Sequence, residues 1–395
     1  MRVLSEQVSG YIQNSSFIRK MFENGIRLKA EFGADKVFDF SLGNPDLPPP
    51  EGVGRALRKV ADNISEPFIT GYMPNAGFPE LRTKVAASVS KEQNTEIKAS
   101  NLVLTCGAAG GINAFFRAVL EQGDEVICPA PYFVEYGFYV ANYGGRLVPV
   151  KAKPFTFELD IEAMEAALTD NTRAILINSP NNPTGVIYSR NQLEQLAEVM
   201  RRHSKKTGKL IYLISDEPYR FLNYDNVEIP SVFDVYENSA VICSYSKSLS
   251  LAGARIGYVV VNPAMDGADE LISGITLTNR ILGFVNAPVI AQHILSEVLG
   301  SEVDMNIYKE RRQAMAEVLD YAGIEYTMPG GAFYFFPKSP LDNDKLFCDK
   351  LMQNKVLAVP GSGFGYSGYF RLTFCVSKDV ITRSAEAFKQ TVDAL

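Results

Sequence analysis

Short apolar runs alternate with longer amphipathic segments through the middle of the chain. Apolar runs bounded by polar turns predict β-strands, and they cover residues 101–105, 125–129, 146–150, 173–178, 210–215, 240–244 and 256–261. Most segments between them, such as 110–123 and 189–206, place apolar residues three or four positions apart, which predicts helices. This alternation favours an α/β fold with a doubly wound, mostly parallel sheet between helices.

The pattern changes towards both ends of the chain. After about residue 285 it loosens into helices and short strands, as in GGAFYFFP (330–337) and GYFRLTF (368–374). The Gly/Pro-rich stretch SLGNPDLPPP (41–50) is typical of an extended crossing between domains. We therefore expect a large domain over residues 48–285. A smaller α+β domain would be formed by both chain ends, residues 1–47 and 286–395.

Composition excludes several classes of function. The 395 residues are 46% hydrophobic and 21% charged with a net charge of −6, which is typical of a globular protein and unlike a nucleic-acid-binding one. No apolar window is long enough to span a membrane, and the first residues lack the apolar core of a secretory signal. The cysteines are scattered without metal-ligand spacing. We expect a cytoplasmic protein with no metal, membrane or nucleic-acid partner.

Unusual residues follow five of the predicted strands. These segments are CGAAGG (106–111), APYF (130–133), SPNNPTG (179–185), DEPY (216–219) and YSK (245–247). In an open parallel sheet, ligands bind beyond the carboxyl ends of the strands, so these segments are expected to form one site. The two histidines, His203 and His293, have no nucleophile or ligand cluster beside them in the sequence. The chemistry is therefore expected to depend on Lys, Asp, Tyr, Asn and Arg.

Lys247 has three interpretations. A lysine in a polar turn is usually a solvated surface charge. Ser244 and Lys247 also match the S-x-x-K pattern of serine acylases, but KTG (206–208) and SDE (215–217) precede it, which reverses the order of that family's elements. The third interpretation is a covalent cofactor anchor, because an amine can form an imine with an aldehyde and the hydroxyls of Ser244 and Ser246 suit a phosphate.

Three other features have both a structural and a functional interpretation. Asp216, at the end of a strand, is either a helix cap or an anion held against a protonated ring nitrogen. The turn 106–111 is either a tight structural turn or a phosphate site at the start of a helix, and it lacks the dinucleotide-binding spacing. Arg371 is a lone guanidinium in an apolar run, so it must meet an anion, either a structural carboxylate or a substrate.

Taken together, the motifs resemble one family over about residues 35–390. They are GNPD (43–46), AGFPELR (76–82), NNPTG (181–185), DEPY (216–219), SYSK (244–247) with Arg255 eight residues on, and PGSGFG (360–365) with GYFRLTF (368–374). In this order they resemble fold-type-I pyridoxal-phosphate enzymes, specifically class I/II aminotransferases of the aspartate aminotransferase superfamily. The resemblance implies a large domain with a mostly parallel sheet between helices and a smaller α+β domain.

The resemblance also implies a role for each candidate residue. Lys247 would be the Schiff-base lysine and the base that moves the substrate proton, and Asp216 would pair with the ring nitrogen of pyridoxal 5'-phosphate. Asn182 and Tyr219 would bind the ring hydroxyl, and Phe133 would stack on the ring. The phosphate would be held by the amides of Ala108 and Ala109, by Ser244, Ser246 and Arg255, and by Tyr72 of the neighbouring subunit of a homodimer.

Substrate recognition is implied less completely. Arg371 would bind the α-carboxylate, with help from Asn182 and the backbone at Gly43. A second carboxylate would need a further arginine, for which Arg280 is a candidate. An apolar or aromatic side-chain pocket would instead use Phe17, Tyr334 and Phe284. The choice among aspartate, alanine and aromatic donors stays open.

The predicted function is transamination of an L-amino acid with a 2-oxo acid, commonly 2-oxoglutarate, by a ping-pong mechanism through the Lys247 Schiff base. The alternative within enzymes is a pyridoxal-phosphate-dependent C–S β-lyase on the same fold, which would release pyruvate and ammonia without an acceptor. A cofactor-binding regulator of this fold would carry an added winged-helix segment that binds DNA. This sequence starts almost directly with the aminotransferase pattern and is acidic, so we expect an enzyme instead.

Overall fold

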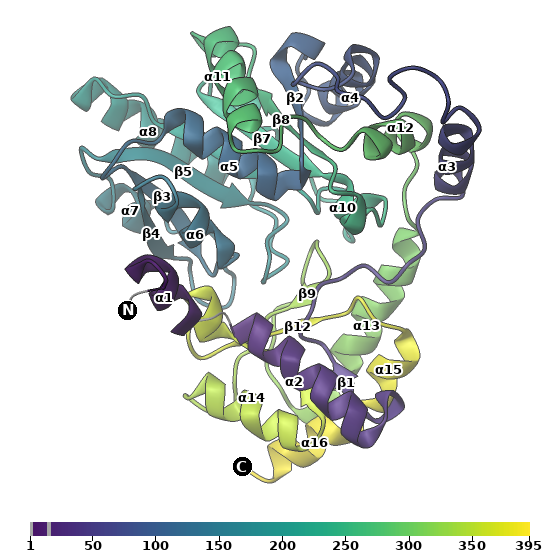
Figure 1. Cartoon of the computed structure of the whole chain (residues 1–395). Coiled ribbons are helices and arrows are strands. Elements are labelled where there is room, and N and C mark those ends of the chain that lie inside the picture. Colours follow the sequence, from purple (N-terminus) through teal and green to yellow (C-terminus); the bar gives the residue numbers. More distant parts are fainter. Residues whose placement is uncertain (1–2, 14–16) are drawn as a thin grey trace.

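A seven-stranded sheet crosses the larger of the two bodies that Figure 1 shows. The computed structural model describes residues 3–13 and 17–395. The strands are β2 (Leu102–Thr105), β3 (Glu125–Ala130), β4 (Arg146–Lys151), β5 (Thr172–Asn178), β6 (Tyr212–Asp216), β7 (Ser239–Ser244) and β8 (Gly257–Val261). Each predicted run overlaps one of them, so the predicted α/β sheet is confirmed.

The strand order is β2-β8-β7-β6-β5-β3-β4. Neighbouring strands run parallel, except that β8 is antiparallel to both β2 and β7. Successive side chains of a strand point to opposite faces, and both faces of this sheet are buried. In β5, for example, Ala174 and Leu176 belong to one core cluster, whereas Ile175 and Ile177 belong to the other.

Helices cover both faces of the sheet. The cluster on one face includes α5 (Gly107–Val119), α6 (Glu135–Ala141) and α11 (Ala268–Ile281). The cluster on the other includes α4 (Pro79–Glu92), α7 (Ile161–Ala166) and α8 (Arg190–Thr207). Short elements complete this body: η2 (Ala99–Asn101), α9 (Val232–Val235), α10 (Tyr245–Ser248) and η3 (Ala252–Ala254). The sheet therefore holds the carboxyl ends of β2, β5, β6 and β7 on a rigid, buried base.

The smaller body, lower in Figure 1, joins both chain ends. Strand β1 (Phe38–Asp39) pairs in parallel with β10 (Val356–Leu357), and β11 (Val359–Pro360), β12 (Phe370–Thr373) and β9 (Tyr334–Phe335) form an antiparallel sheet. Its other elements are α2 (Phe17–Phe32), η1 (Ala34–Lys36), α13 (Met305–Ala322), α14 (Asp344–Gln353), η4 (Gly361–Phe364), α15 (Lys378–Arg383) and α16 (Ala385–Asp393).

Two helices within the predicted smaller domain pack against the larger body. Helix α12 (Val289–Val298) packs against α3 (Gly52–Asp62) and contributes Ala291 and Leu295 to a core cluster of the large sheet. Helix α1 (Glu6–Gln13) contacts α6, where the Tyr11 and Phe138 rings lie 4.6 Å apart. The division into 48–285 and 1–47 with 286–395 stays a prediction, and this packing favours a later second boundary, at the end of α12.

Among the residues that the structure describes, no helix is both long enough and apolar enough to cross a membrane.

Candidate active site

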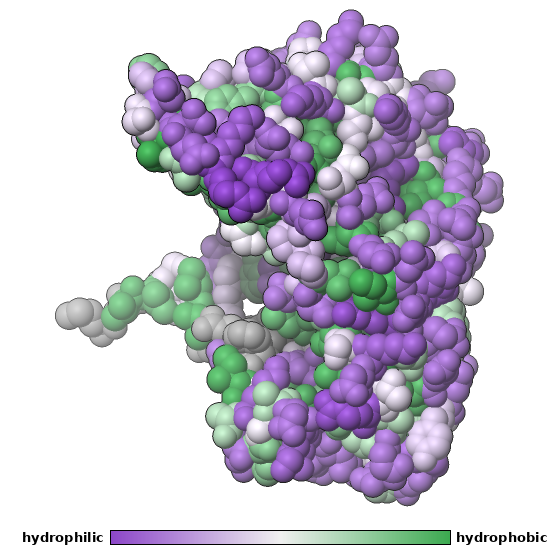
Figure 2. Space-filling view, turned by 90° about the vertical axis from the view of Figure 1, so that its right-hand side faces the viewer, coloured by the Kyte–Doolittle hydropathy of each residue, from purple (hydrophilic) through white to green (hydrophobic). Residues whose placement is uncertain are grey.

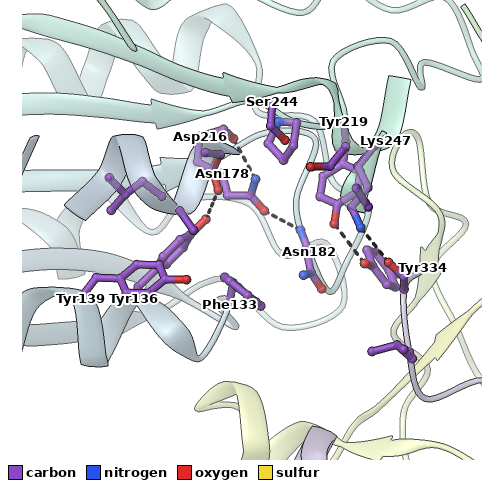
Figure 3. A pocket seen from close by; sticks show the side chains of 18 of the residues that line it. Phe133, Tyr136, Tyr139, Asn178, Asn182, Asp216, Tyr219, Ser244, Lys247 and Tyr334 are labelled. Atoms are coloured by element: carbon purple, nitrogen blue, oxygen red, sulfur yellow. Dashed lines mark hydrogen bonds between the residues drawn. The ribbon is translucent and has the colours of Figure 1, made fainter. Parts of the chain in front are cut away.

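A pocket of about 290 Å³ lies at the carboxyl ends of the large sheet's strands (Figure 3). Twelve predicted site residues line it: Gly43, Ala108, Ala109, Phe133, Asn182, Asp216, Tyr219, Ser244, Ser246, Lys247, Arg255 and Arg371. Tyr72 does not line it; this side chain is 88% exposed and borders a separate surface hollow. The structure thus brings together every residue predicted to hold the cofactor or the substrate α-carboxylate, except Tyr72, which was assigned to a neighbouring subunit.

Lys247 lies in α10, directly after β7, and its side chain enters the pocket. Its Nζ donates a hydrogen bond to the carbonyl oxygen of Gly43 at 2.7 Å. Burial lowers the pKa of Lys247 to about 8; Cys375 raises it, and the positive charges of Arg371 and Arg255 lower it further. The surface-charge interpretation is therefore wrong, because this amine faces a pocket and loses its proton more readily than an exposed lysine.

Asp216 is the last residue of β6 and is 6% exposed. Its Oδ2 accepts a hydrogen bond from the Tyr136 hydroxyl at 2.5 Å, whereas its Oδ1 is buried and has no partner among the described residues. Burial raises the pKa of Asp216 to about 7; the Tyr136 bond lowers it and nearby Glu217 raises it. No helix of the described chain begins at Asp216, so the helix-cap interpretation is also wrong.

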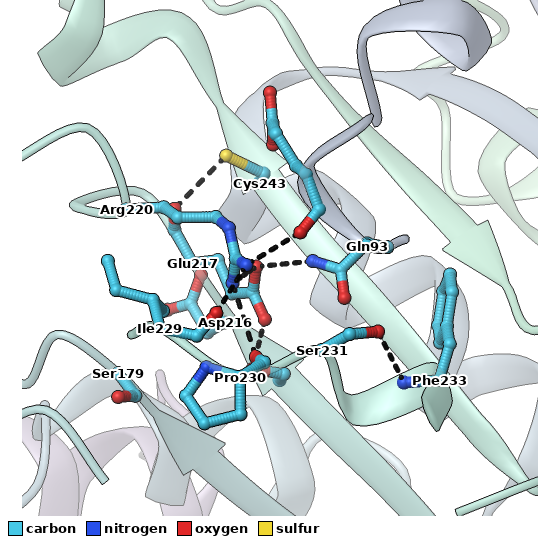
Figure 4. Close-up of polar contacts among 12 residues, drawn as sticks. Gln93, Ser179, Asp216, Glu217, Arg220, Ile229, Pro230, Ser231, Phe233 and Cys243 are labelled. Atoms are coloured by element: carbon cyan, nitrogen blue, oxygen red, sulfur yellow. Dashed lines mark hydrogen bonds and ion pairs between the residues drawn. The ribbon is translucent and has the colours of Figure 1, made fainter. Parts of the chain in front are cut away.

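A buried polar network fixes the turn that follows Asp216 (Figure 4). Glu217 Oε1 accepts from the Ser215 hydroxyl at 2.7 Å, and its Oε2 accepts from Gln93 Nε2 at 2.9 Å and from Arg220 Nη1 at 3.1 Å. Arg220 Nη2 also donates to the carbonyl oxygens of Glu92 and Ile229, each at 2.7 Å. The network ties the β6 end to α4 and to the chain before α9, and so holds Asp216 and Tyr219 in place.

The start of α5 forms one corner of the pocket and has the groups that can bind an anion. The first amides of a helix have no partner within it, and Ala108 and Ala109 occupy these positions here. A Cβ at Gly107, where φ is +69°, would lie 3.0 Å from the Arg255 guanidinium. A Cβ at Gly257 would lie 2.5 Å from the Cys243 carbonyl oxygen, so only glycine allows this close approach of β8. The guanidinium and the helix amides therefore face the same space.

Arg371 lies on β12 in the smaller body, lines the pocket and is 2% exposed. Its Nη1 donates to Asn182 Oδ1 at 3.1 Å, and its Nη2 donates to the Ser41 carbonyl oxygen. The rings of Tyr334 and Phe364 lie 4.7 and 4.8 Å from the guanidinium carbon. No carboxylate of the described chain forms an ion pair with Arg371, so its charge is left for an anion that enters the pocket.

Sequence reasoning missed two polar residues of the site and placed a third in another role. Asn178 is the last residue of β5. Its Nδ2 donates to the Asp216 backbone carbonyl oxygen at 2.8 Å, and its Oδ1 accepts from the Asn182 backbone N–H at 2.7 Å. Its position at a strand end was a usable signal. Tyr136 gave no such signal, because it lies inside α6. Tyr334 was expected only to line a side-chain pocket. Its hydroxyl also forms a hydrogen bond with the Tyr219 hydroxyl, with 3.0 Å between the two oxygens.

Most of the residues proposed to recognise the substrate side chain do not line the pocket. Arg280 is exposed in the last turn of α11 and is absent from the pocket lining. Phe284 is 37% exposed and borders the same surface hollow as Tyr72. The side chain of Phe17 lies outside the described part of the chain. Of these candidates, only Tyr334 lines the pocket of its own chain.

Comparison with known proteins gives a consistent result. The family model described as aminotransferase class I and II matches residues 35–388. A probable aspartate/prephenate aminotransferase of Aquifex aeolicus is 32% identical over 379 residues, which cover 91% of this chain and 92% of the relative.

Two crystal structures match along nearly the whole chain. An amino transferase from Eubacterium rectale has a TM-score of 0.95 at 37% identity, covering 100% of this chain and 99% of the other. The aspartate aminotransferase of Thermus thermophilus, solved with maleate, has a TM-score of 0.89 at 29% identity, covering 99% and 100%. This chain is a member of the class I and II aminotransferase family, whose enzymes use pyridoxal phosphate.

Proposed function

We propose that this aminotransferase moves the amino group of an L-amino acid to 2-oxoglutarate by a ping-pong mechanism, with Lys247 as the covalent cofactor anchor. One observation carries the proposal. A single pocket holds the Lys247 amine, one buried oxygen of Asp216 and the Arg371 guanidinium. Among the described residues, this Asp216 oxygen has no hydrogen-bond partner, and no carboxylate forms an ion pair with Arg371. Membership of the family supports amino-acid and 2-oxo-acid substrates in general.

The free polar groups of the pocket fit pyridoxal phosphate. When bound, this cofactor supplies an aldehyde that links to amines and a protonated ring that accepts the electrons of a broken Cα–H bond. Asp216 Oδ1 would accept the hydrogen bond of the ring nitrogen, which satisfies its missing partner. Asn182 uses its Oδ1 for Arg371, so its Nδ2 is left to donate to the ring hydroxyl together with Tyr219. Phe133 would stack on the ring.

The phosphate would occupy the corner at the start of α5. The amides of Ala108 and Ala109 and the charge of Arg255 provide hydrogen bonds and an opposite charge for it. The hydroxyls of Ser244 and Ser246 line the same pocket, and both residues are less than 9% exposed. Charge-assisted hydrogen bonds from these groups would fix the orientation of the cofactor in the pocket.

Lys247 would move the proton during the reaction. Its pKa near 8 leaves a usable fraction of neutral amine near neutral pH, and this form can take the proton from the substrate Cα. Arg371 would hold the substrate α-carboxylate through its planar guanidinium, with the backbone at Gly43 beside it. Because Lys247 Nζ already contacts the Gly43 carbonyl oxygen, the amine and the bound carboxylate would lie on the same side of the pocket.

A homodimer is part of the proposal. Phe68 and Tyr72 are 86% and 88% exposed, which is unusual for large aromatic side chains and favours burial against a second copy. The N-terminal segment adds exposed Val3 and Ile12, and it stands out from the body as a partly apolar arm (Figure 2). In such a dimer, Tyr72 would reach the phosphate of the neighbouring site. The cytoplasmic location stays a prediction.

The half-reaction tests the proposed function. Protein loaded with pyridoxal phosphate is mixed with single amino acids, aspartate first, without any 2-oxo acid. We expect release of one equivalent of 2-oxo acid per site and then no more, with loss of the near-visible absorbance of the bound cofactor. Addition of 2-oxoglutarate should restore that absorbance. Continuous release of pyruvate and ammonia would instead identify the C–S β-lyase, to which the relatives described above give no support.

A further inference from the structure

Tyr136 is the one side chain of the described chain that donates a hydrogen bond to the Asp216 carboxylate. Its hydroxyl lies 2.5 Å from Oδ2, and the dashed line in Figure 3 joins the two residues. The other nearby donor, Asn178, bonds the backbone oxygen of Asp216 and leaves the carboxylate untouched. Tyr136 is 1% exposed, and its ring packs edge-on against Phe133 with 5.6 Å between centroids. Its hydroxyl is therefore held in one place.

This contact makes the two oxygens of the Asp216 carboxylate different. With Oδ2 bonded to Tyr136, Oδ1 is the oxygen without a partner, and Asp216 lines the pocket. A carboxylate that has lost this contact is free to rotate about its terminal bond, because that torsion is broad. The Tyr136 ring also packs against Phe133, the residue on which the cofactor ring would stack.

The contact also bears on the charge of Asp216. The ionisable groups that act on it or feel its charge lie on β3, α6, β7 and its own turn, and they are Cys128, Tyr136, Tyr139, Cys243 and Glu217. None is a cation. Burial and Glu217 both disfavour the carboxylate ion, and the Tyr136 hydrogen bond favours it. Burial and Asp216 hold the Tyr136 pKa well above 10, so the hydroxyl stays a donor.

We propose that Tyr136 is a positioning residue that keeps Asp216 ionised, with Oδ1 turned towards the cofactor, so that the ring nitrogen of pyridoxal phosphate is held protonated. The inference rests on the proposed role of Asp216. Tyr136 would touch neither the substrate nor the reacting atoms. It would act on the ring nitrogen only through Asp216.

Solid-state ¹⁵N NMR of protein loaded with pyridoxal phosphate labelled at the ring nitrogen tests the proposal, because the chemical shift reports protonation of that atom without any turnover. The variants are Tyr136→Phe, Asp216→Asn, and both together, compared near neutral pH. Tyr139→Phe is the matched control, since Tyr139 lies one turn of α6 further along, lines the same pocket and has no hydrogen bond to Asp216 in the described chain.

We expect a protonated ring nitrogen in the wild type and in Tyr139→Phe, and a neutral one in Asp216→Asn. Tyr136→Phe should lower the ratio of protonated to neutral nitrogen by about 10-fold or more, the usual worth of a hydrogen bond to a charged group. It should cause no further change in the Asp216→Asn background, because its effect passes through Asp216.

Each other outcome contradicts a specific statement. A wild-type signal in Tyr136→Phe would overturn the inference and leave the role of Asp216 intact. A neutral ring nitrogen in the wild type would overturn the role of Asp216 and the inference with it. If Tyr136→Phe does not bind the cofactor, Tyr136→His replaces it, because histidine keeps a ring N–H that can donate to Asp216. We then expect a protonated nitrogen in the cofactor ring, and a neutral one would contradict the proposal.

Discussion

At the scale of single residues, the site consists of charged groups placed where water cannot stabilise them. Lys247 and Asp216 both have pKa values moved towards neutrality by burial, the amine to about 8 and the carboxyl to about 7. The Arg371 guanidinium lies among aromatic rings and forms no ion pair with a carboxylate of the described residues. Such groups destabilise the empty protein, and a ligand of opposite charge relieves the cost.

Replacement of Arg371 by lysine tests its role. Lysine keeps the charge but loses the planar fork, so binding of the substrate α-carboxylate should weaken. We expect KM for the amino-acid donor to rise by about 10-fold or more, as follows from the loss of one charge-assisted hydrogen bond. Steady-state kinetics measure this, with Arg280→Lys as the control, since that exposed side chain is absent from the pocket lining. An unchanged KM in Arg371→Lys would contradict the assignment.

The titration of Asp216 predicts a pH-dependent stability of the cofactor-free protein. Its pKa is raised from the ordinary 3.8 to about 7, so the folded state keeps the proton to higher pH than the unfolded chain does. The wild type should therefore lose stability as the pH rises from about 4 to about 7, whereas Asp216→Asn does not titrate. We expect Asp216→Asn to be more stable than the wild type by about 2–4 kcal/mol above pH 7, and the difference to shrink towards pH 4.

Denaturant unfolding of the two cofactor-free proteins across this pH range measures the difference. An equal difference at all pH values would show that Asp216 titrates as an ordinary carboxyl.

The sequence was sufficient to predict that Lys247, Asp216 and Arg371 share one pocket. Lys247 and Asp216 lie at the ends of predicted strands, and Arg371 lies within an apolar run. At Lys247 the local pattern alone is that of a surface lysine, and the cofactor-anchor interpretation came from the neighbouring motifs and their combined resemblance to one family. Tyr136 was not recoverable in this way. Its hydrogen-bond partner is 80 residues away, and a tyrosine within an amphipathic helix has the same local pattern whether it packs or donates. Only the packing of α6 against the sheet reveals the contact.

At the scale of elements, the ends of β6 and β7 place the reactive groups, and buried polar contacts hold those ends. Glu217 and Arg220 form an ion pair whose side chains are 3% and 14% exposed. Removal of one member leaves the other charged and buried, which costs far more than loss of a surface pair.

We predict that Glu217→Ala lowers the free energy of unfolding by about 3 kcal/mol, because Arg220 and Gln93 lose their common acceptor. Glu228→Ala is the control: this carboxylate pairs with Arg190 but is 61% exposed, so its loss should cost about 1 kcal/mol or less. Urea denaturation compares the two. Similar losses in both variants would mean that the network behind Asp216 does not stabilise the turn.

The strands could be predicted from the sequence because both faces of the sheet are buried, which makes each strand a continuous apolar run. The order of the strands and the reversed direction of β8 could not be predicted, because an apolar run has the same pattern whichever way the strand points and whichever strand lies beside it. The packing of α12 also could not be predicted, because its apolar face packs on α3, which is distant in sequence, while the chain around it follows the looser pattern of the smaller body.

At the scale of the whole molecule, the pocket is lined from both bodies, with Lys247 and Asp216 from the larger and Tyr334 and Arg371 from the smaller. Tyr72 has no place in the pocket of its own chain. The proposed homodimer gives it one, in the site of the neighbouring subunit.

Mixed dimers test this arrangement. Lys247→Ala and Tyr72→Ala chains, each of low activity alone, are unfolded together and refolded. If Tyr72 acts across the interface, half of the dimers are mixed and each has one intact site, so about a quarter of the wild-type activity should return. Sedimentation velocity establishes that dimers form. No recovery, with dimers present, would place Tyr72 in its own chain's site or outside any site.

The central claim is that Lys247 binds the cofactor covalently in this pocket, and chemical trapping tests it most directly. Protein loaded with pyridoxal phosphate is reduced with borohydride, digested and examined by mass spectrometry. We expect a single modified peptide, with the reduced pyridoxyl phosphate group on Lys247, and no modification at the exposed lysines 205 and 206. A label distributed over surface lysines, or none at Lys247, would contradict it.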